Sequence, residues 1–378
     1  MMPRIPLSAP DITDAEIAAV TAVLRTVRLS LGPELEEFEK ALASFHSVPY
    51  AVAVSSGTAG LHLALLTLGV GEGAEVIVPS FAFVAVANAV VQVRATPVFV
   101  DIDPVTLNLD PELVELAITS RTRAILVVHT FGVPAEMDRM REIANHHHLA
   151  IVEDTCEALG AEFGSKRVGG FGDLAVLGFY PNKQITTGEG GAVLARDSVH
   201  AARLRSLRNQ GRIPGAGWLD HAEIGYNYRL SELACALGRV QLNRIDEILS
   251  QRRLAAEHYQ AALFEIPGIE PPPVELPHRL ISWFVYVVRL QDDSLGASEP
   301  SLRDRIRMVL GANGIATSSY FAPIHQQPAW RNHPSAATRL PHTESIARRT
   351  LALPFFNRIS KEQQQEVIET LVRAIRGL

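Results

Sequence analysis

Short runs of apolar, often β-branched residues recur along the first half of the chain and alternate with segments of helical periodicity. The runs are Tyr50 to Val54, Glu75 to Val78, Pro97 to Val100, Arg123 to Val128, Leu149 to Val152, Leu174 to Leu177 and Gly191 to Leu194. Segments between them, such as Ala59 to Leu68 and Glu136 to Asn145, have helical spacing. Strands that are apolar at nearly every position are typical of parallel sheets covered by helices on both faces. The pattern predicts an α/β fold with a mostly parallel, doubly wound sheet.

The pattern changes after Arg196, where longer helical stretches replace the short strands. Leu230 to Ile248 and Arg252 to Phe264 have helical periodicity, and the proline cluster Pro271 to Pro273 follows them. Beyond this cluster, strands are predicted at 283–290 and 315–319, and helices at 302–310, 343–351 and 361–375. We therefore expect a large domain over residues 1–245, which includes an N-terminal arm, and a smaller α+β domain over residues 246–378.

Composition and charge narrow the class of function. The 378 residues include 35 Lys and Arg against 41 Asp and Glu, a net charge of −6, so the chain lacks the positive field that attracts nucleic acids or anionic membranes. The two cysteines, Cys156 and Cys235, fit a reducing compartment and cannot build a disulfide framework. The first 14 residues contain no apolar signal region, and the apolar run Phe81 to Val91 is shorter than the roughly 20 residues that span a bilayer. We expect a cytoplasmic protein without a membrane segment.

Candidate chemistry is sought where predicted strands run into helices, because α/β sheets bind ligands beyond the carboxyl ends of their strands. The first such junction is Ser55-Ser-Gly-Thr-Ala-Gly60. Its backbone N–H groups and the Thr58 hydroxyl can hold a phosphate at a helix N-terminus, or the same small residues can simply cap the helix. The junction lacks the lysine of a P-loop and the spacing of a dinucleotide fingerprint.

Two further junctions carry a carboxylate and a lysine. Asp154 follows Glu153 at the end of the fifth predicted strand, where it can face a protonated ring nitrogen or cap the next turn. Lys183 stands in the Gly- and Thr-rich loop Gly178 to Gly191, where it is a surface group or, if held in a cleft, a nucleophile toward an aldehyde. A phosphate cup, a ring-facing carboxylate and an imine-forming lysine together fit pyridoxal 5′-phosphate.

Several segments, taken in order, carry a resemblance to a known family. They are Ser56 to Ala59, Pro79 to Ala85, Pro97 to Asp103, Val128-His129, Glu153-Asp154, the lysine loop, Gly225 to Glu232, Pro323 to His325 and Leu353-Pro354. These segments resemble the DegT/DnrJ/StrS family of sugar aminotransferases, within the aspartate aminotransferase superfamily of fold type I. The resemblance covers nearly the whole chain and implies a pyridoxal-phosphate-dependent aminotransferase.

The resemblance also implies roles for the matching positions. Lys183 would form the Schiff base with the cofactor and later move the proton between substrate and cofactor. Asp154 would keep the pyridine nitrogen protonated, and Phe83 would stack on the ring. Gly57 and Thr58 would hold the phosphate.

The resemblance places a further cofactor contact across a subunit boundary. Asn227 would reach the phosphate from the neighbouring subunit, which implies a homodimer with shared active sites. The sequence departs from many relatives at two positions near the cofactor. Gly178 stands where they have a phosphate-binding Ser, and Glu157 stands where they have Gln or His, so its carboxyl near the cofactor O3′ would have to be protonated or otherwise paired.

Polar residues outside the cofactor set are candidates for contact with substrate. Arg229 can bind the carboxylate of the amino donor, and His325 and His129 can touch substrate. The alternative for Arg229 is a structural salt bridge, and for each histidine it is a hydrogen-bonded structural role. The three histidines at 146–148 lie on a predicted helix, where successive side chains point about 100° apart, so we expect no metal site.

The resemblance implies transfer of an amino group from L-glutamate to a keto sugar carried on a nucleotide. The resulting amino sugar would be used in the synthesis of a polysaccharide or an antibiotic. The lysine loop and the segment Glu153 to Glu157 look most like perosamine-synthase relatives, which act on a GDP-linked 4-keto-6-deoxy hexose. A dTDP-linked 3- or 4-keto sugar is the alternative. Relatives that dehydrate sugars with pyridoxamine phosphate have His in place of the lysine, so Lys183 favours transamination. A non-catalytic regulator is a third alternative, against which the set of cofactor-facing residues argues.

Overall fold

A computed structural model of the chain describes residues 3–213, 217, 219–291 and 301–377. Its α-helices are α1 (Asp14–Leu24), α2 (Pro33–Phe45), α3 (Gly57–Thr67), α4 (Ala85–Gln92), α5 (Pro111–Leu116), α6 (Met137–His147), α7 (Ser198–Arg208), α8 (Glu232–Asn243), α9 (Ile245–Leu263), α10 (Leu302–Ala312), α11 (Pro341–Arg349) and α12 (Lys361–Arg376). Its strands are β1 (Tyr50–Val54), β2 (Glu75–Pro79), β3 (Thr96–Val100), β4 (Thr122–Val128), β5 (Ala150–Asp154), β6 (Glu162–Phe163), β7 (Lys166–Arg167), β8 (Leu174–Gly178), β9 (Gly191–Ala195), β10 (Ile269–Glu270), β11 (Arg279–Leu280), β12 (Tyr286–Leu290) and β13 (Thr350–Leu353). Short 3₁₀ turns are η1 (Thr130–Gly132), η2 (Ile324–Gln326) and η3 (Pro334–Ala336).

Seven strands form the central sheet in the order β1-β9-β8-β5-β4-β2-β3. β9 pairs antiparallel with its two neighbours, and the remaining pairs are parallel. These are the seven strands that the apolar runs predicted, and their ends agree to within two residues. The predicted α/β class with a mostly parallel, doubly wound sheet is confirmed.

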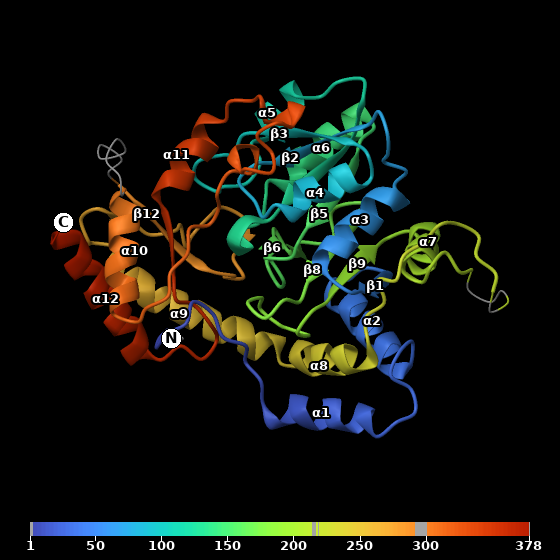
Figure 1. Cartoon of the computed structure of the whole chain (residues 1–378), viewed down its shortest axis with the longest axis horizontal. Helices are drawn as coiled ribbons and strands as arrows, with labels where there is room; N and C mark the ends of the chain where they lie inside the picture. The colour runs from blue at the N-terminus through green and yellow to red at the C-terminus, as the bar shows by residue number, and fades with distance from the viewer. Residues whose placement is uncertain (1–2, 214–216, 218, 292–300, 378) are drawn as a thin grey trace.

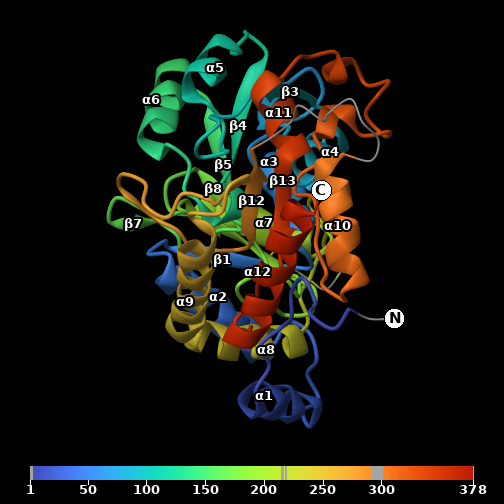
Figure 2. The same ribbon diagram turned by 90° about the vertical axis from the view of Figure 1, so that its left-hand side faces the viewer.

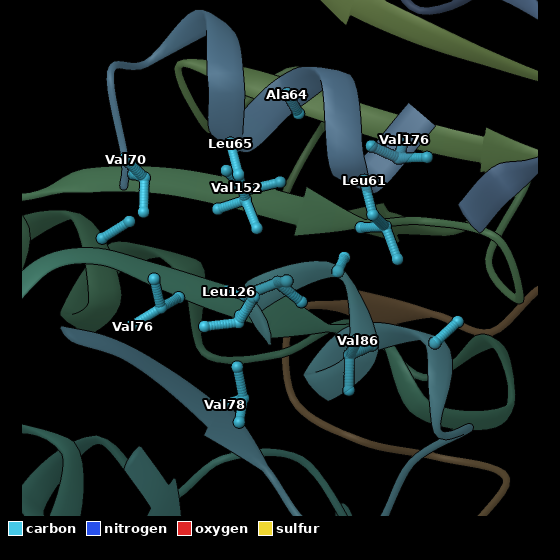
Figure 3. Close-up of a cluster of buried hydrophobic side chains, with 14 of the residues drawn as sticks. Leu61, Ala64, Leu65, Val70, Val76, Val78, Val86, Leu126, Val152 and Val176 are labelled. Carbon is cyan, nitrogen blue, oxygen red and sulfur yellow. The ribbon is translucent and has the colours of Figure 1, made fainter. Parts of the chain in front are cut away.

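Both faces of this sheet are covered by helices, which explains the nearly continuous apolar runs. Val52 of β1 joins the cluster beneath α3, α4 and α7, whereas its neighbour Ala51 joins the cluster formed with α2 and α8. Figure 3 shows Leu65 of α3 facing Leu126 and Val152 of the sheet. Because successive residues of a strand point to opposite faces, both sets of positions must be apolar.

The C-terminal part of the chain builds a second, smaller layer beside the sheet (Figures 1 and 2). Its antiparallel sheet has the order β10-β12-β13 and packs with α9, α10 and α12 around a separate apolar cluster. The predicted smaller α+β unit is confirmed. The predicted strand at 315–319 is wrong, since only isolated bridges form there, at Ile315 and Ser318. The predicted helix over 343–351 ends too late, because residues 350–353 form β13.

The N-terminal arm joins distant parts of the chain. Ile5 pairs with Ile315 and belongs to the C-terminal apolar cluster, and α1 lies against α8 along the base of the molecule (Figure 1). The predicted continuous helix over 230–248 is interrupted between α8 and α9 at Arg244, whose guanidinium binds Glu16 at 2.9 Å and Asp11 at 3.2 Å. These ion pairs tie the corner to the arm. A domain boundary near residue 245 stays a prediction.

No helix in the described ranges combines the length and the apolar character that a membrane crossing requires.

Candidate active site

The ends of β1, β5 and β8 meet at one edge of the central sheet. Asp154 is the last residue of β5, which pairs with β8, and Gly178 at the end of β8 pairs with Gly191 of β9. Gly191 in turn pairs with Val54, the last residue of β1. The small-residue junction after β1, the Asp154 carboxylate and the loop between β8 and β9 therefore lie together.

The junction after β1 is the N-terminus of α3. Ser56 caps this helix, and its hydroxyl oxygen accepts a hydrogen bond from the N–H of Ala59 at 3.0 Å. The capping interpretation is confirmed, and it does not compete with phosphate binding, because the N–H groups of Gly57 and Thr58 in the first turn have no partner within the helix. A Cβ on Gly57 would lie 2.8 Å from Cys156 Sγ, so glycine allows a close approach to the neighbouring strand end.

Asp154 is buried at this edge, with 8% of its surface exposed. Its Oδ1 accepts a hydrogen bond from the N–H of Cys156 at 3.0 Å, so the turn-capping interpretation is confirmed for one oxygen. A carboxylate has a second oxygen, and a cap of this kind leaves it for an N–H donor of a ligand. The cap therefore orients Asp154 without using up its capacity to bind.

The neighbouring carboxylate, Glu153, faces the interior and is fully buried. It accepts hydrogen bonds from the N–H groups of Gly169, Phe171 and Gly172 and lies 3.1 Å from His129 Nε2. Although burial raises its pKa, these bonds hold the pKa of Glu153 below its ordinary value. His129 Nδ1 accepts the N–H of Ala135 at 3.1 Å, so Nε2 carries the proton that Glu153 receives. The structural interpretation of His129 is confirmed.

The Lys183 side chain lies between a carboxylate and an aromatic ring, and 16% of it is exposed. Its Nζ is 3.8 Å from Glu157 Oε1 and 4.0 Å from the ring centre of Phe284. Glu157 Oε2 accepts the N–H of Phe131 at 2.9 Å. Burial raises the pKa of Glu157, and the charge of Lys183 opposes that rise. The buried carboxyl thus has two partners.

The departure at Gly178 has a steric cause. A Cβ on Gly178 would lie 3.1 Å from both Cβ and Sγ of Cys156, which is tighter than an ordinary contact. The Cys156 side chain fills the space between Gly57 and Gly178, where the side chain of a serine would have to lie. Glycine at position 178 therefore leaves room for the Cys156 side chain at the ends of β5 and β8.

Sequence reasoning missed Tyr320, which comes to the lysine loop from the C-terminal part of the chain. Burial raises the pKa of Tyr320, the charge of Glu157 adds to the rise, and the side chain of Asn182 opposes it. The phenol therefore lies near both residues. Its ring stacks on Phe321 at a centroid distance of 5.2 Å and approaches Phe131 at 6.4 Å. No local sequence pattern distinguishes this tyrosine, because Glu157, Asn182 and Phe131 are far away from it in the chain.

Three of the predicted site residues lie toward the surface of the single chain. Phe83 is 62% exposed, and Asn227 is exposed as well. Arg229 is partly buried and donates to Asn209 Oδ1 at 3.0 Å. The carbonyl of Tyr228 accepts the Ser55 N–H at 2.8 Å, so the segment that carries Asn227 runs beside the junction after β1.

His325, by contrast, is 5% exposed and lies between two polar side chains. Its backbone N–H donates to Ser80 Oγ at 3.2 Å, and the same hydroxyl lies 2.7 Å from His325 Nδ1. Nε2 lies 3.4 Å from Glu344 Oε1. Burial lowers the pKa of His325, and Glu344 opposes that effect. Both ring nitrogens thus face protein groups.

The groups at the sheet edge fit pyridoxal 5′-phosphate. Unpaired N–H groups at the start of α3 suit a phosphate, a buried carboxylate at the end of β5 suits a ring nitrogen, and a lysine amine suits an aldehyde. These three kinds of group meet at one edge, although they come from distant parts of the chain.

Known proteins are similar to this chain in sequence and in fold over nearly its whole length. The model of the family described as the DegT/DnrJ/EryC1/StrS aminotransferase family matches residues 10–372. GDP-perosamine synthase of Caulobacter vibrioides is 40% identical over 331 residues, 87% of this chain and 87% of that protein. The dTDP-3-amino-3,4,6-trideoxy-alpha-D-glucose transaminase of Streptomyces venezuelae is 39% identical over 376 residues, which cover 98% of this chain and 96% of that protein.

Solved structures extend the similarity to three dimensions. DesV of S. venezuelae superposes with a TM-score of 0.89 at 38% identity over 98% of both chains. The PLP form of Spr1654 of Streptococcus pneumoniae superposes with a TM-score of 0.93 at 28% identity over 99% of both chains.

Proposed function

We propose that this protein transfers an amino group from L-glutamate to a nucleotide-linked keto sugar. The proposal starts from the family: the chain belongs to the DegT/DnrJ/EryC1/StrS aminotransferase family and is a pyridoxal 5′-phosphate-dependent sugar aminotransferase. The observation that carries this proposal is the meeting of Lys183, Asp154 and the α3 N-terminus at one edge of the sheet. A GDP-linked 4-keto-6-deoxy hexose is the first candidate, and a dTDP-linked 3- or 4-keto sugar is the second. Relatives named for each nucleotide are about equally similar to the chain.

Each residue of this edge has a distinct part in the proposed reaction. When bound, pyridoxal 5′-phosphate supplies an aldehyde that accepts an amino group and a ring that withdraws electrons from the reacting carbon. Lys183 would bind the aldehyde carbon through Nζ with loss of water and, once displaced by the amine of the donor, would move a proton on and off the reacting carbon. Asp154 keeps a proton on the ring nitrogen, because a carboxylate favours a neighbouring positive charge. Gly57 and Thr58 bind the phosphate through their N–H groups.

The remaining predicted residues act around this centre. We assign Glu157 to the ring hydroxyl of the cofactor, supported by its buried position 3.8 Å from Lys183 Nζ. Phe83 stacks on the ring, and Arg229 binds the carboxylate of the amino donor. His325 remains a candidate for substrate contact, although its ring nitrogens already face Ser80 and Glu344.

A panel of substrates tests the proposed function. The purified protein with pyridoxal 5′-phosphate and L-glutamate is incubated with GDP-linked and dTDP-linked 4-keto-6-deoxy hexoses and with a dTDP-linked 3-keto sugar. Mass spectrometry detects replacement of the carbonyl oxygen by an amino group, and release of 2-oxoglutarate is measured in parallel. We expect amination of the GDP-linked sugar. Amination of a dTDP-linked sugar alone would support the second candidate, and no amination with any sugar and several donors would contradict the proposal.

We further propose that the enzyme is a homodimer with shared active sites, in which Asn227 reaches the cofactor phosphate of the partner subunit. Exposed apolar side chains support a protein interface. They include Ile17, Leu24, Val27 and Leu29 near the N-terminus and Leu219 and Ile224 in the segment before Asn227. A second copy of the chain would remove these side chains from water.

Mixing two inactive variants tests the shared site. Lys183→Ala removes the reactive amine, and Asn227→Asp places a carboxylate beside the phosphate, which repels it. Each homodimer is expected to be inactive, whereas a heterodimer contains one site that takes Lys183 from one chain and Asn227 from the other. Activity should therefore recover to about one active site per heterodimer after subunit exchange.

The alternative for Asn227 is the phosphate of its own chain, because Tyr228 already contacts Ser55 there. In that case every site of the heterodimer carries one of the two defects. No recovery, despite exchange shown by native mass spectrometry, would then contradict the shared site. A mixture of wild-type and Lys183→Ala subunits serves as the activity control, because its heterodimers keep one intact site under either arrangement.

A further inference from the structure

Phe284 contacts the reactive lysine from the C-terminal part of the chain. The Lys183 ammonium lies 4.0 Å from the centre of its ring, and Phe284 itself is 2% exposed. The face of an aromatic ring carries partial negative charge and attracts a cation placed over it. Glu157 Oε1 lies 3.8 Å from the same nitrogen. The lysine amine thus contacts both a carboxylate and an aromatic ring.

The backbone at Phe284 is anchored by a buried arginine. Arg252 of α9 is 2% exposed and donates from Nε to the carbonyl of Trp283 at 2.7 Å and from Nη2 to the carbonyl of Phe284 at 2.8 Å. Its Nη1 donates to Asn357 Oδ1. A buried guanidinium needs such acceptors, and each bond restrains the segment that carries the ring.

The opposite side of this segment is anchored by η1. The carbonyl of Phe131 accepts the Phe284 N–H at 3.3 Å, and the carbonyl of Gly132 accepts the Ser282 N–H at 3.2 Å. Gly132 has a φ of 89°, and a Cβ there would lie 2.9 Å from Trp283 N. Because the Phe131 N–H also binds Glu157, a single turn positions both groups that hold the lysine.

The backbone on both sides of this contact is strained. Phe131 and Trp283 have φ values of 58° and 51°, in the left-handed region that bulky residues avoid. Such conformations persist only where the surroundings hold them, and they cluster at functional sites. Here the hydrogen bonds from Arg252 and between the two segments hold them in place.

We propose that Phe284 is a positioning residue for Lys183: its ring face holds the lysine amine at the reacting edge of the sheet and attracts its charged form whenever the amine is not bonded to the cofactor. The proposal rests on the proposed role of Lys183 and adds to it a contact from the C-terminal part of the chain. Arg252 and Gly132 support the contact by fixing the backbone on either side of the ring.

Chemical labelling of the lysine tests this contact without relying on turnover. The full-length protein, freed of cofactor, receives short pulses of acetic anhydride at pH 8, and mass spectrometry measures acetylation of Lys183 relative to the exposed Lys361. Only the uncharged amine reacts, so a contact that attracts the charged form slows labelling. We expect acetylation of Lys183 to be about 3- to 10-fold faster in Phe284→Leu than in the wild type. Phe284→Tyr keeps the ring face and should keep the wild-type rate.

Labelling at pH 11 separates this effect from easier access to the lysine. At that pH most ordinary lysine amines are uncharged, so the ratio of the Phe284→Leu rate to the wild-type rate should be much smaller than at pH 8 if the ring acts on the charge. An increase of the same size at pH 8 and pH 11 would mean that the variant only opened the site. That result, or a wild-type rate in Phe284→Leu at pH 8, would overturn the proposal.

Substitution of Gly132 provides an independent test, and the same substitution at Gly73 provides a matched control. Gly132→Ala should accelerate labelling at pH 8 at least about 2-fold, because its Cβ displaces the backbone before Phe284. Gly73→Ala introduces similar backbone strain, with a φ of 82° and no atom within 4 Å of the added Cβ, and should leave labelling unchanged. Equal labelling in the two variants would overturn the proposal.

Borohydride reduction of the wild-type holoenzyme identifies the lysine that binds the cofactor. If the cofactor is found on another lysine while Phe284→Leu still shows the pH-dependent increase, the contact stands and the proposed role of Lys183 fails. If the cofactor is found on Lys183 without that increase, the proposed function stands and the role of Phe284 is refuted.

Discussion

Lys183→Ala is expected to abolish turnover while leaving the fold intact. The variant loses both the covalent link to the cofactor and the base that moves the proton, so kcat should fall by at least about 10³-fold. The side chain lies in a loop and has only 16% of its surface exposed, yet its contacts are one ion pair and one ring face. The free energy of unfolding of the cofactor-free protein should therefore change by less than about 1 kcal/mol. Steady-state rates and denaturation of the cofactor-free protein measure the two quantities.

The control for this variant is a second lysine on the same half of the molecule. Lys166 lies in the short strand β7 and is partly buried, and its ammonium sits over the ring of Phe171 at 4.6 Å. Lys166→Ala removes a comparable cation–π contact and should keep kcat within about 2-fold of the wild type. Borohydride reduction and peptide mapping should place the cofactor on the peptide that contains Lys183. Recovery of the label on Lys166, or substantial turnover by Lys183→Ala, would contradict the assignment.

Asp154→Asn is expected to keep the cofactor bound but to lower kcat by about 10²-fold or more. A neutral amide no longer stabilises the protonated ring nitrogen, and an opposite charge within about 4–6 Å is worth one to three pKa units to its partner. The substitution is nearly isosteric, and Asn Oδ1 can still accept the N–H of Cys156, so the turn after β5 should remain capped. Absorption spectra of the bound cofactor and steady-state rates measure the effect. A rate near that of the wild type would refute the role of Asp154.

The adjacent carboxylate provides the contrast. Glu153→Gln replaces an acceptor of three backbone N–H groups and of His129 with a side chain that is partly a donor. We expect the free energy of unfolding to fall by about 2–4 kcal/mol, with a much smaller change in the spectrum of the bound cofactor. Asp154→Asn should thus lose activity without losing stability, and Glu153→Gln should lose stability. This difference would show that Asp154 acts on the cofactor and that Glu153 stabilises the fold.

Much of the fold could be predicted from the sequence, because strands and helices are local. The seven apolar runs became the strands of the central sheet, and the change of pattern after Arg196 marked the passage to longer helices. Errors arose where tertiary contacts override local preference. Arg244 interrupts a helical pattern because its ion pairs with Glu16 and Asp11 hold a corner there. Thr350 begins a strand because β12 offers it a partner.

The residues of the site also fall into two groups: those that the sequence could identify and those that only the tertiary structure brought together. Lys183, Asp154 and the small residues after β1 could be found from the sequence, since each follows a predicted strand and the carboxyl ends of parallel strands meet at one edge of the sheet. The sequence alone therefore determined which reactive groups converge and which cofactor they suit.

The tertiary structure alone decided what surrounds those groups. It brought Phe284 beneath Lys183 and Tyr320 beside Glu157, placed Cys156 where Gly178 leaves room, and buried His325 against Ser80. The members of these pairs are up to 245 residues apart in the chain. Except for the pair Cys156 and Gly178, their contacts depend on how the small C-terminal layer docks on the sheet. Local propensity carries no information about that docking, because it is set by the packing of complete apolar clusters and the satisfaction of buried polar groups.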